Sequence, residues 1–363
     1  MNSQTKENIV IVIPAYEPDD RLITYIKELK ETCFDNIVAV DDGSGPDYQR
    51  IFDKIQEKVI VLHHDVNKGK GAALKTAYKW ILENLQNISG VITADSDGQH
   101  SVADCVKIAE MLKKDDNVLY LGSRDFNLPN IPPKSRSGNK ITSLIFKLLY
   151  GQYLPDTQTG LRGFRSEELP FMINVEGERY EYEMNVLIAC AIAKIPMISI
   201  PIETIYENNN EGTHFNPVKD SWKIYKVLFG NFFKFMGSSL ISTLVDQSLF
   251  NFLNLVVFSN GIANHGEYIL ASTIIARVIS SVINFSLNRN LVFGKNNDGK
   301  RAFVKYVILC ICVMLLSAGG TWALSRIGIN TSISKIIVDT MLYFVSYHFQ
   351  QVWVFSPNTS LTS

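Results

Sequence analysis

Two aspartates one residue apart stand out in the first third of the chain. Asp95 and Asp97 lie in the run Ala94-Asp95-Ser96-Asp97-Gly98-Gln99, which follows an apolar stretch. Their carboxylates and the amide oxygen of Gln99 are ligands that a hard divalent cation such as Mg²⁺ or Mn²⁺ prefers, with water and substrate phosphates completing its coordination. The run therefore predicts a metal site for a phosphorylated ligand. The alternative is that both aspartates are turn or N-cap residues before a helix beginning at Val102.

Further polar motifs occur in the same part of the chain. They read Pro14-Ala15-Tyr16-Glu17, Asp41-Asp42-Gly43-Ser44, Asn67-Lys68-Gly69-Lys70-Gly71 and Gly122-Ser123-Arg124. The first strand is not followed by the GxGxxG motif of dinucleotide-binding dehydrogenases, and the GxxxxGK[ST] motif of P-loop ATPases is absent. The run from Lys68 to Gly71 indicates either a backbone nest for phosphate or only a flexible start of a helix.

Buried β-branched runs explain why these motifs would meet. Five short apolar runs end in turn residues, as expected for strands buried on both faces of a parallel sheet: 9–13, 37–40, 59–62, 90–94 and 118–121. Helical stretches lie between them, at 19–33, 70–85 and 102–113. The alternation predicts an α/β domain with a mostly parallel, doubly wound sheet. Ligands bind at the carboxyl ends of the strands in such sheets, where the polar motifs stand.

Charge and composition divide the chain into two parts. The formal net charge of −1 gives no reason to expect a nucleic-acid partner. Most charged residues precede the last third, which is apolar with short charged islands. The N-terminus shows no basic segment followed by an apolar one, so we expect no signal peptide and a cytosolic first domain. The five cysteines have no zinc-like spacing and are expected to be ordinary buried thiols.

The ordered motifs resemble those of family 2 glycosyltransferases, and most of all the dolichol- or polyprenyl-phosphate sugar synthases. The resemblance rests on residues 13–17, 40–44, 67–71 and 94–100, and is extended by 122–124 and 156–165. It implies a GT-A fold and Mg²⁺ or Mn²⁺ as cofactor. It also implies inverting transfer of a sugar from a nucleotide-sugar, such as a UDP-sugar, to polyprenyl (undecaprenyl) phosphate for cell-envelope glycosylation.

The resemblance implies roles for individual residues as well. It assigns Pro14, Tyr16, Glu17, Asp42 and Lys68 to the nucleotide, Asp95, Asp97 and Gln99 to the metal, Arg124, Arg136 and Ser137 to the acceptor phosphate, and Asp156 and Gln158 to the sugar. Asp95, Asp97, Arg124 and Asp156 would be catalytic. The alternative for the arginines is a solvated surface, and His100 is expected to be structural. The synthases carry an Arg-Gly-Ser-Lys-like stretch after the last strand, but 206–215 here contains no Arg, so His214 or a different geometry would hold the donor phosphates.

The residue types suit this chemistry. A departing nucleoside diphosphate develops negative charge, so a cation is the main requirement. The attacking phosphate oxygen is already anionic at neutral pH, so no strong general base is needed. Arg124 and Arg136 would position that phosphate by charge-assisted hydrogen bonds.

The C-terminal part predicts an all-α domain of four transmembrane helices, at 235–258, 269–293, 303–324 and 333–355. Each run has about the 20 residues that cross ~30 Å of hydrocarbon. An all-helical soluble domain is the alternative, although few charges interrupt the runs. Lysines precede the first run, Lys and Arg fill the linker after the second, and 260–267 has neither. The positive-inside rule then places the catalytic domain and both chain ends in the cytosol, at the plasma membrane.

The four runs also form a weak internal repeat. Phe232-Phe233-Lys234-Phe235 and Phe303-Val304-Lys305-Tyr306 open two hairpins that close at Phe293 and Phe355. These segments resemble the GtrA family, which is associated with moving lipid-linked sugars across membranes. Asp246 and Arg277 fall at similar depth. We hypothesise that they pair, or line a polar path for the lipid headgroup; the alternative is a purely structural ion pair.

The expected domains are a cytosolic glycosyltransferase domain at 1–215, an amphipathic juxtamembrane helix at 216–231 and a GtrA-like transmembrane domain at 232–357. The segment from Ile141 to Leu149 predicts another amphipathic helix, on the membrane or in the core. A processive polysaccharide synthase is an alternative function, although its QxxRW-like motif is absent. A transporter with a regulatory nucleotide-binding domain is another. The expected partners are the donor, the lipid acceptor and membrane lipids, and a homo-oligomer stays open.

Overall fold

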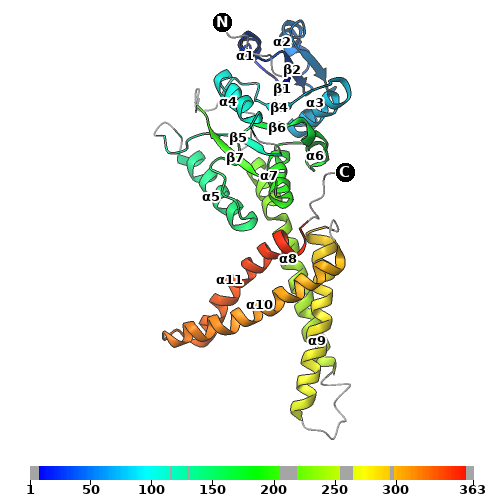
Figure 1. Cartoon of the computed structure of the whole chain (residues 1–363), viewed down its shortest axis with the longest axis vertical. Coiled ribbons are helices and arrows are strands. Elements are labelled where there is room, and N and C mark those ends of the chain that lie inside the picture. Colours follow the sequence, from blue (N-terminus) through cyan, green and yellow to red (C-terminus); the bar gives the residue numbers. More distant parts are fainter. Residues whose placement is uncertain are drawn as a thin grey trace. The chain divides into compact units, whose positions relative to one another are not determined.

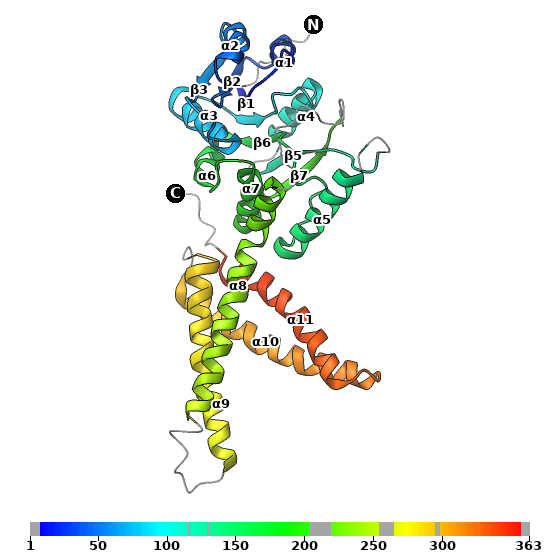
Figure 2. The ribbon, with the colours of Figure 1, turned by 180° about the vertical axis from the view of Figure 1, so that it is seen from behind.

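The chain folds into two compact units, Met1–Leu228 and Phe229–Ser363. The computed structural model describes residues 8–114, 117–128, 131, 133–203, 219–253, 265–294 and 298–356. The first unit is a sheet with helices on both faces, and the second consists of long helices (Figures 1 and 2). Helix α8 (Lys219–Phe252) contributes residues to both units.

A seven-stranded mixed sheet forms the centre of the first unit. Its strands are β1 (Ile9–Ala15), β2 (Asn36–Asp41), β3 (Ile60–His63), β4 (Gly90–Thr93), β5 (Leu119–Ser123), β6 (Arg162–Arg165) and β7 (Met197–Pro201), in the order β3-β2-β1-β4-β6-β5-β7. The predicted α/β class is confirmed, and each of the five predicted strands is present. β6 pairs antiparallel with both β4 and β5, while the other pairings are parallel.

Parallel pairing brings the strand ends together at one edge of the sheet. Ala15, at the end of β1, is opposite Asp41, at the end of β2. β6 begins at this same edge, because Arg162 is opposite Thr93, the last residue of β4. The loops after β1, β2 and β4 and the loop before β6 therefore converge.

Alternating strand side chains supply two cores. Ile9, Ile11 and Ile13 of β1 pack in one core with α1 (Arg21–Glu31), α2 (Gln49–Ile55) and α4 (Val102–Leu112). The other face carries α3 (Lys70–Asn84), which contacts β1 and β2, with α6 (Leu169–Asn174) and α7 (Glu181–Ala193) beside it. Burial on both faces explains why the strands are continuous apolar runs.

Helix α5 (Pro133–Tyr150) has two different faces. Phe146 and Leu149 are buried, whereas Leu144 and Leu148 are exposed, with Ile141 one turn earlier also exposed. The hydroxyl of Tyr150 donates to the Leu228 carbonyl at 2.9 Å, so α5 packs on the first turns of α8. The core alternative thus describes the buried face of the helix, and membrane contact by the exposed face stays a prediction.

The described part of the second unit contains α8, α9 (His265–Leu287), α10 (Gly299–Arg326) and α11 (Thr331–Phe349). By length and composition, two described stretches suffice to cross a membrane, Ile224–Phe252 and Gly299–Arg326. The predicted all-α region is confirmed, and four membrane-spanning helices stay a prediction. The predicted first span also extends into 254–258, outside the described residues.

The predicted repeat corresponds to two helices that end alike. α9 continues into a π-helical turn at Asn288–Val292 and α11 into one at Gln350–Val354. The residues that follow, Phe293 and Phe355, stack with ring centroids 5.1 Å apart. Nδ2 of Asn288 donates to Oε1 of Gln350 at 2.9 Å. The two hairpins are therefore joined at equivalent positions.

Candidate active site

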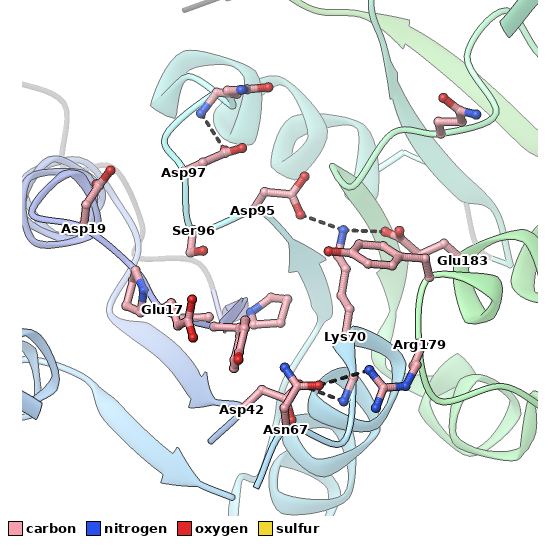
Figure 3. Close-up of a pocket in the computed structure, with 18 of the residues that line it drawn as sticks. Glu17, Asp19, Asp42, Asn67, Lys70, Asp95, Ser96, Asp97, Arg179 and Glu183 are labelled. Atoms are coloured by element: carbon pink, nitrogen blue, oxygen red, sulfur yellow. Dashed lines mark hydrogen bonds and ion pairs between the residues drawn. The ribbon is translucent and has the colours of Figure 1, made fainter. Parts of the chain in front are cut away.

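A cavity of about 780 Å³ lies where the strand-end loops of the first unit converge. Its lining comes from the loops after β1, β2, β4 and β5, from the segment before β6, and from the starts of α3 and α7. Figure 3 shows Glu17, Asp42, Asp95, Asp97 and Glu183 around one space, with Lys70 and Arg179 among them. The mixture of carboxylates and cations suits a charged ligand.

Most of the predicted site residues line this cavity. They are Pro14, Tyr16, Glu17, Asp42, Asp95, Asp97, Gln99, Arg124 and Gln158. Lys68, Arg136, Ser137 and Asp156 are not among its lining residues. His214 lies outside the described residues. The strand ends thus bring together motifs that are far apart along the chain, as the sheet topology predicts.

Asp42 shapes the loop that leads into α3. Its carboxylate is buried and accepts hydrogen bonds from the backbone N–H groups of Lys68 and Gly69, at 2.9 and 2.7 Å. Nδ1 of His64 lies 2.7 Å from the same carboxylate. Gly69 has φ of +107°, and a Cβ there would collide with Arg179. Asp42 therefore fixes the glycine-rich loop as well as lining the cavity.

Asp95 shares a lysine with Glu183. Nζ of Lys70 lies 2.7 Å from Oδ1 of Asp95 and 2.9 Å from Oε1 of Glu183, and Nε2 of His100 lies 3.2 Å from the other Asp95 oxygen. Burial alone would raise the pKa of Asp95, but the charge of Lys70 and the hydrogen bond with His100 hold it below its ordinary value. Burial would likewise lower the pKa of Lys70, but the two carboxylates raise it. Asp95 and Lys70 are therefore an ion pair at neutral pH.

The segment before β6 packs against Asp95. The hydroxyl of Thr93 donates to the Gly160 carbonyl at 2.7 Å. A Cβ at Gly160 would lie 2.3 Å from Oδ2 of Asp95. Only glycine leaves room for the carboxylate here, so this segment sets where Asp95 lies.

Asp97 faces the same cavity with a different partner. Its Oδ1 accepts a hydrogen bond from the backbone N–H of Gln99 at 3.0 Å (Figure 3). Burial, and then the negative charge of Asp95, raise the pKa of Asp97. The N-cap of α4 is Ser101, whose side chain accepts from the N–H of Asp104, so neither predicted metal ligand caps this helix. Within the described residues, no group of three or more His, Cys, Asp or Glu side chains is arranged around a metal position.

Arg124 and Asp156 form a two-point ion pair. Nε of Arg124 lies 2.7 Å from Oδ2 of Asp156, and its Nη2 lies 3.2 Å from Oδ1. Asp156 is fully buried, while Arg124 lines the cavity and lies over the ring of Phe126. The structure thus places the predicted sugar residue behind the predicted phosphate residue.

The start of α5 lies beside this pair. Asn139 on α5 donates to the Pro155 carbonyl and accepts from the N–H of Thr157, so the helix holds the loop that carries Asp156. Nη2 of Arg136 donates to the Leu128 carbonyl at 2.7 Å. The Nε of Arg136 is buried without a hydrogen-bond partner in the part of the chain that is described.

In the second unit, Asp246 and Arg277 are close. Nη2 of Arg277 lies 3.4 Å from Oδ2 of Asp246, and the hydroxyl of Ser280 donates to Oδ1 of Asp246 at 3.0 Å. The other hairpin holds a comparable group that the sequence analysis did not single out. There, Asp339 accepts from Ser317 and from Lys335.

Sequence reasoning missed Lys70 and Glu183 as a pair. Lys70 stands in a motif that the sequence analysis did single out, but only as part of a phosphate nest. Glu183 belongs to none of the quoted motifs and lies far along the chain, in the first turn of α7. The sequence did hold one signal for Lys70, its positive charge at the first position of a helix. A cation there is unfavourable with respect to the helix dipole and so suggests a nearby carboxylate.

Comparisons with known proteins identify both parts of the chain. Residues 10–169 match the model of glycosyl transferase family 2, and residues 226–355 match that of the GtrA/DPMS transmembrane domain. An uncharacterized protein of Methanocaldococcus jannaschii is 32% identical over 237 residues, 64% of this chain and 96% of that protein. The UDP-N-acetylglucosamine–dolichyl-phosphate N-acetylglucosaminyltransferase of Methanococcus voltae is 32% identical over 217 residues, 54% of this chain and 86% of that one.

Among solved structures, glucosyl-3-phosphoglycerate synthase from Mycobacterium tuberculosis aligns with a TM-score of 0.47 at 14% identity, over 62% of this chain and 80% of that one. Its crystals contain Mn²⁺, uridine diphosphate and glucosyl-3-phosphoglycerate.

The α/β unit with its cavity of carboxylates and cations is thus the catalytic unit of a glycosyltransferase. The chain belongs to glycosyltransferase family 2, and it also carries a GtrA/DPMS transmembrane domain. The predicted family, enzyme class and membrane domain are confirmed, and the protein is a membrane protein. Its relatives include a transferase whose name gives dolichyl phosphate as the acceptor.

Proposed function

We propose that this enzyme transfers a sugar from a UDP-sugar to polyprenyl phosphate, with inversion at the anomeric carbon and with a divalent cation. The cavity supports this proposal. It has Asp95 and Asp97 on one side and Arg124 on another, and one segment, 156–160, contacts both sides. The Methanococcus voltae relative is named for the same classes of donor and acceptor.

The residues after β4 fit a divalent cation. Asp95, Asp97 and Gln99 all line the cavity, and the pKa of Asp97 is raised by its burial and then by the negative charge of Asp95. Two carboxylates and an amide oxygen leave positions for diphosphate oxygens and water. When bound, the ion would neutralise the charge that develops on the leaving diphosphate. Asp95 and Asp97 would have to turn from their present partners to share it.

Arg124 would orient the acceptor phosphate. Asp156 holds the guanidinium group at two points, so Arg124 presents a fixed positive charge to the cavity. The phosphate nucleophile needs no base, and the fixed cation would serve to align it with the anomeric carbon. Arg136, whose Nε is buried, and Ser137 would extend this contact from the start of α5. Gln158, which lines the cavity, would contact the sugar.

The exposed face of α5 would lie on the membrane. Ile141, Leu144 and Leu148 form an exposed apolar stripe, and Lys140 and Lys147 beside them are exposed. Apolar and basic side chains together suit an anionic leaflet. The lysines before the first long apolar helix and in 295–305 support a cytosolic catalytic unit and cytosolic chain ends at the plasma membrane.

The decisive test incubates membranes containing the full chain with labelled sugar nucleotides and then extracts the lipids. We expect a labelled lipid whose sugar is released by mild acid, and we expect Asp97→Ala to abolish it. Asp53→Ala, an exposed aspartate on α2, is the matched control and should leave the product unchanged. A labelled polymer would support a processive synthase instead. Absence of product with every donor would support a transporter with a regulatory nucleotide site.

Translocation of the lipid-linked sugar is a second candidate function, supported by the polar groups in the helices. Aligning the two hairpins on Phe293 and Phe355 places Arg277 opposite Asp339, and aligning their starts places Asp246 opposite Ser317. Each hairpin therefore carries a polar contact between its helices at the same level. Charged groups inside a bilayer are costly, which favours a functional reason for keeping them.

Proteoliposomes test translocation separately. Product would be made on the outer face, and membrane-impermeant periodate would then oxidise the sugars that remain outside. We expect a protected fraction for the wild-type chain and its loss in the double variant Asp246→Asn/Arg277→Gln, with transfer activity retained. Ser286→Ala, an exposed position on α9, is the control. Full accessibility of the wild-type product would contradict translocation.

A further inference from the structure

We propose that Lys70, held by Glu183, is an exchangeable counter-ion of Asp95: it neutralises Asp95 in the empty donor site, and it turns to the donor diphosphate when a divalent cation binds Asp95. This inference rests on the proposed function, since it assumes a cation and a diphosphate in this cavity. Its observation is the bridge between two carboxylates from separate elements, Asp95 after β4 and Glu183 on α7 (Figure 3).

The position of Lys70 has a local cost. It is the first residue of α3, where the partial positive charge of the helix favours anions, and the first turn of α3 has no acidic residue. Helix stability therefore does not explain a lysine here. The two carboxylates at 2.7 and 2.9 Å do explain it, because together they require a positive charge between them.

Lys70 and Glu183 would stay together when Asp95 is released. The start of α3 is fixed to the segment before α7: the N–H of Ala72 donates to the Glu178 carbonyl at 2.8 Å, and Gly71 lies against Tyr182, where a Cβ would come within 2.5 Å. Asp95 is on a different loop. The Lys70–Glu183 contact thus joins two elements that also contact each other directly, whereas the Lys70–Asp95 contact reaches the separate loop after β4.

Lys70 and a divalent cation cannot both contact Asp95 without strong repulsion. The ammonium group already lies 2.7 Å from Oδ1 of Asp95, which is hydrogen-bonding distance. A cation on the same carboxylate would place two positive charges side by side. Lys70 lines the same cavity and has a long flexible side chain, so a diphosphate bound beside the cation gives it new acceptors.

The arginines that line the cavity contact other side chains. Arg124 pairs with Asp156, Arg21 pairs with Asp19, and Arg179 donates to Asn67. The sequence from Tyr206 to Phe215 supplies neither Lys nor Arg. Lys70, by contrast, contacts a proposed metal ligand directly.

The test measures Mn²⁺ binding to the purified full chain in detergent, by the electron paramagnetic resonance signal of free Mn²⁺, with no nucleotide present. Lys70→Met removes the competing cation, so the Kd for Mn²⁺ should fall about tenfold, which corresponds to ~1.4 kcal/mol. Glu183→Gln removes the carboxylate that shares Lys70 with Asp95. Lys70 should then pair more tightly with Asp95, and the Kd for Mn²⁺ should rise. The two variants are thus expected to change Mn²⁺ affinity in opposite directions.

A second measurement, of UDP binding, tests whether Lys70 contacts the diphosphate. With saturating Mn²⁺, Lys70→Met should weaken binding of UDP about tenfold, since it loses a charge-assisted contact. Lys79→Met, an exposed lysine on the same helix, is the matched control and should change neither affinity. Lys70→Met alone leaves the carboxylate of Glu183 without its partner, which could unfold the protein. The double variant Lys70→Met/Glu183→Gln removes both charges and avoids this problem. It should still bind Mn²⁺ more tightly than the wild type.

The outcomes separate this inference from the proposed function. Equal or weaker Mn²⁺ binding in both Lys70 variants overturns the exchange, as does a wild-type chain that binds no Mn²⁺, even if that chain makes the labelled lipid. Tighter Mn²⁺ binding with weaker UDP binding supports the exchange. That result would stand even if no sugar reached a lipid, in which case only the proposed acceptor would be wrong.

Discussion

Arg124 and Asp156 are joined by two parallel contacts of 2.7 and 3.2 Å, with the carboxylate fully buried and the guanidinium group lining the cavity. A buried carboxylate keeps a cation in one orientation, because the pair has only one geometry that satisfies both oxygens. The position of the proposed acceptor phosphate thus depends on a residue that does not itself line the cavity.

Asp156→Asn should separate these roles. The amide keeps the size of the side chain but removes its charge and one acceptor, so Arg124 loses its fixed orientation. We expect kcat/KM to fall about 10²-fold, as for a misplaced reacting group, with a smaller effect on donor binding. Asp125→Asn, at the adjacent exposed aspartate, is the control, measured in the labelled-lipid assay. Wild-type kinetics in Asp156→Asn would show that Arg124 needs no such support.

Gly160→Ala should disturb Asp95 through space. The added Cβ would lie 2.3 Å from the carboxylate, so Asp95 must move away from Lys70 and His100. We expect transfer activity and Mn²⁺ affinity to fall at least about tenfold while the far-ultraviolet circular dichroism stays unchanged. Gly138→Ala on α5, where no atom lies within 4 Å of the new Cβ, should keep activity.

Asp95 and Asp97 should have opposite effects on the stability of the metal-free protein. Asp97 has a raised pKa, so its ionised form destabilises the fold, and Asp97→Asn should raise the melting temperature at pH 7.5. Asp95 has a lowered pKa, so its charge stabilises the fold above the unfolded pKa, and Asp95→Asn should lower the melting temperature.

The two effects should respond differently as the pH falls from 7.5 to 4, because the two carboxylates have pKa values shifted in opposite directions. The penalty from Asp97 shrinks once the pH falls below its raised folded-state pKa. The stabilisation from Asp95 persists down to the ordinary aspartate pKa of about 4 and is lost only below it, because its folded-state pKa is lowered. Thermal unfolding in detergent with a chelator, from pH 7.5 to pH 4, measures this. Changes of the same sign in the two variants would contradict the assignment.

The exposed stripe on α5 should affect the lipid substrate alone. Leu144→Glu places a charge on this face, so the KM for polyprenyl phosphate in vesicles should rise severalfold, with the KM for the nucleotide-sugar unchanged. A short, water-soluble acceptor should be used equally well by variant and wild type. Leu82→Glu, at another exposed leucine, on α3, is the control. An equal effect in both variants would mean that the stripe has no special role.

The Asp246–Arg277 contact can be tested by exchange of the charges. Asp246→Arg and Arg277→Asp should each lower the melting temperature in detergent, because each brings like charges together between α8 and α9. The double variant should recover most of the loss. If it recovers nothing, the two residues are not a pair in the folded protein.

The sequence predicts those parts of the fold that local pattern determines. β1 is predictable because Ile9-Val10-Ile11-Val12-Ile13 is apolar at every position, as a strand buried on both faces requires. β6 is not, because Arg162-Gly163-Phe164-Arg165 contains a single large apolar residue. Its Arg162 is buried only because Nε donates to the Thr159 carbonyl and Nη1 to the Glu183 carbonyl. Those contacts exist only in the assembled domain.

The candidate site is likewise only partly predictable from the sequence. Strand ends with carboxylates identify Asp95 and Asp97, because topology alone brings such residues to one edge. Their partners do not follow from the sequence. No sequence pattern near Glu183 indicates that it contacts Lys70. Separate roles are assigned to Arg124 and Asp156 from the sequence, and only the structure shows that they form an ion pair.

The position of β6 sets the distance between the ends of β4 and β5, and its direction decides which residues fill the space between them. Adjacent strands are about 4.8 Å apart, so a strand placed between β4 and β5 holds the two parallel strand ends about 10 Å from each other. Because β6 runs antiparallel to its neighbours, the residues that lead into it enter at the edge where β4 and β5 end. There, Gly160 lies against Asp95 and Asp156 pairs with Arg124. A β6 that ran parallel to its neighbours would begin at the opposite edge of the sheet, and the residues before it would not reach Asp95 or Arg124.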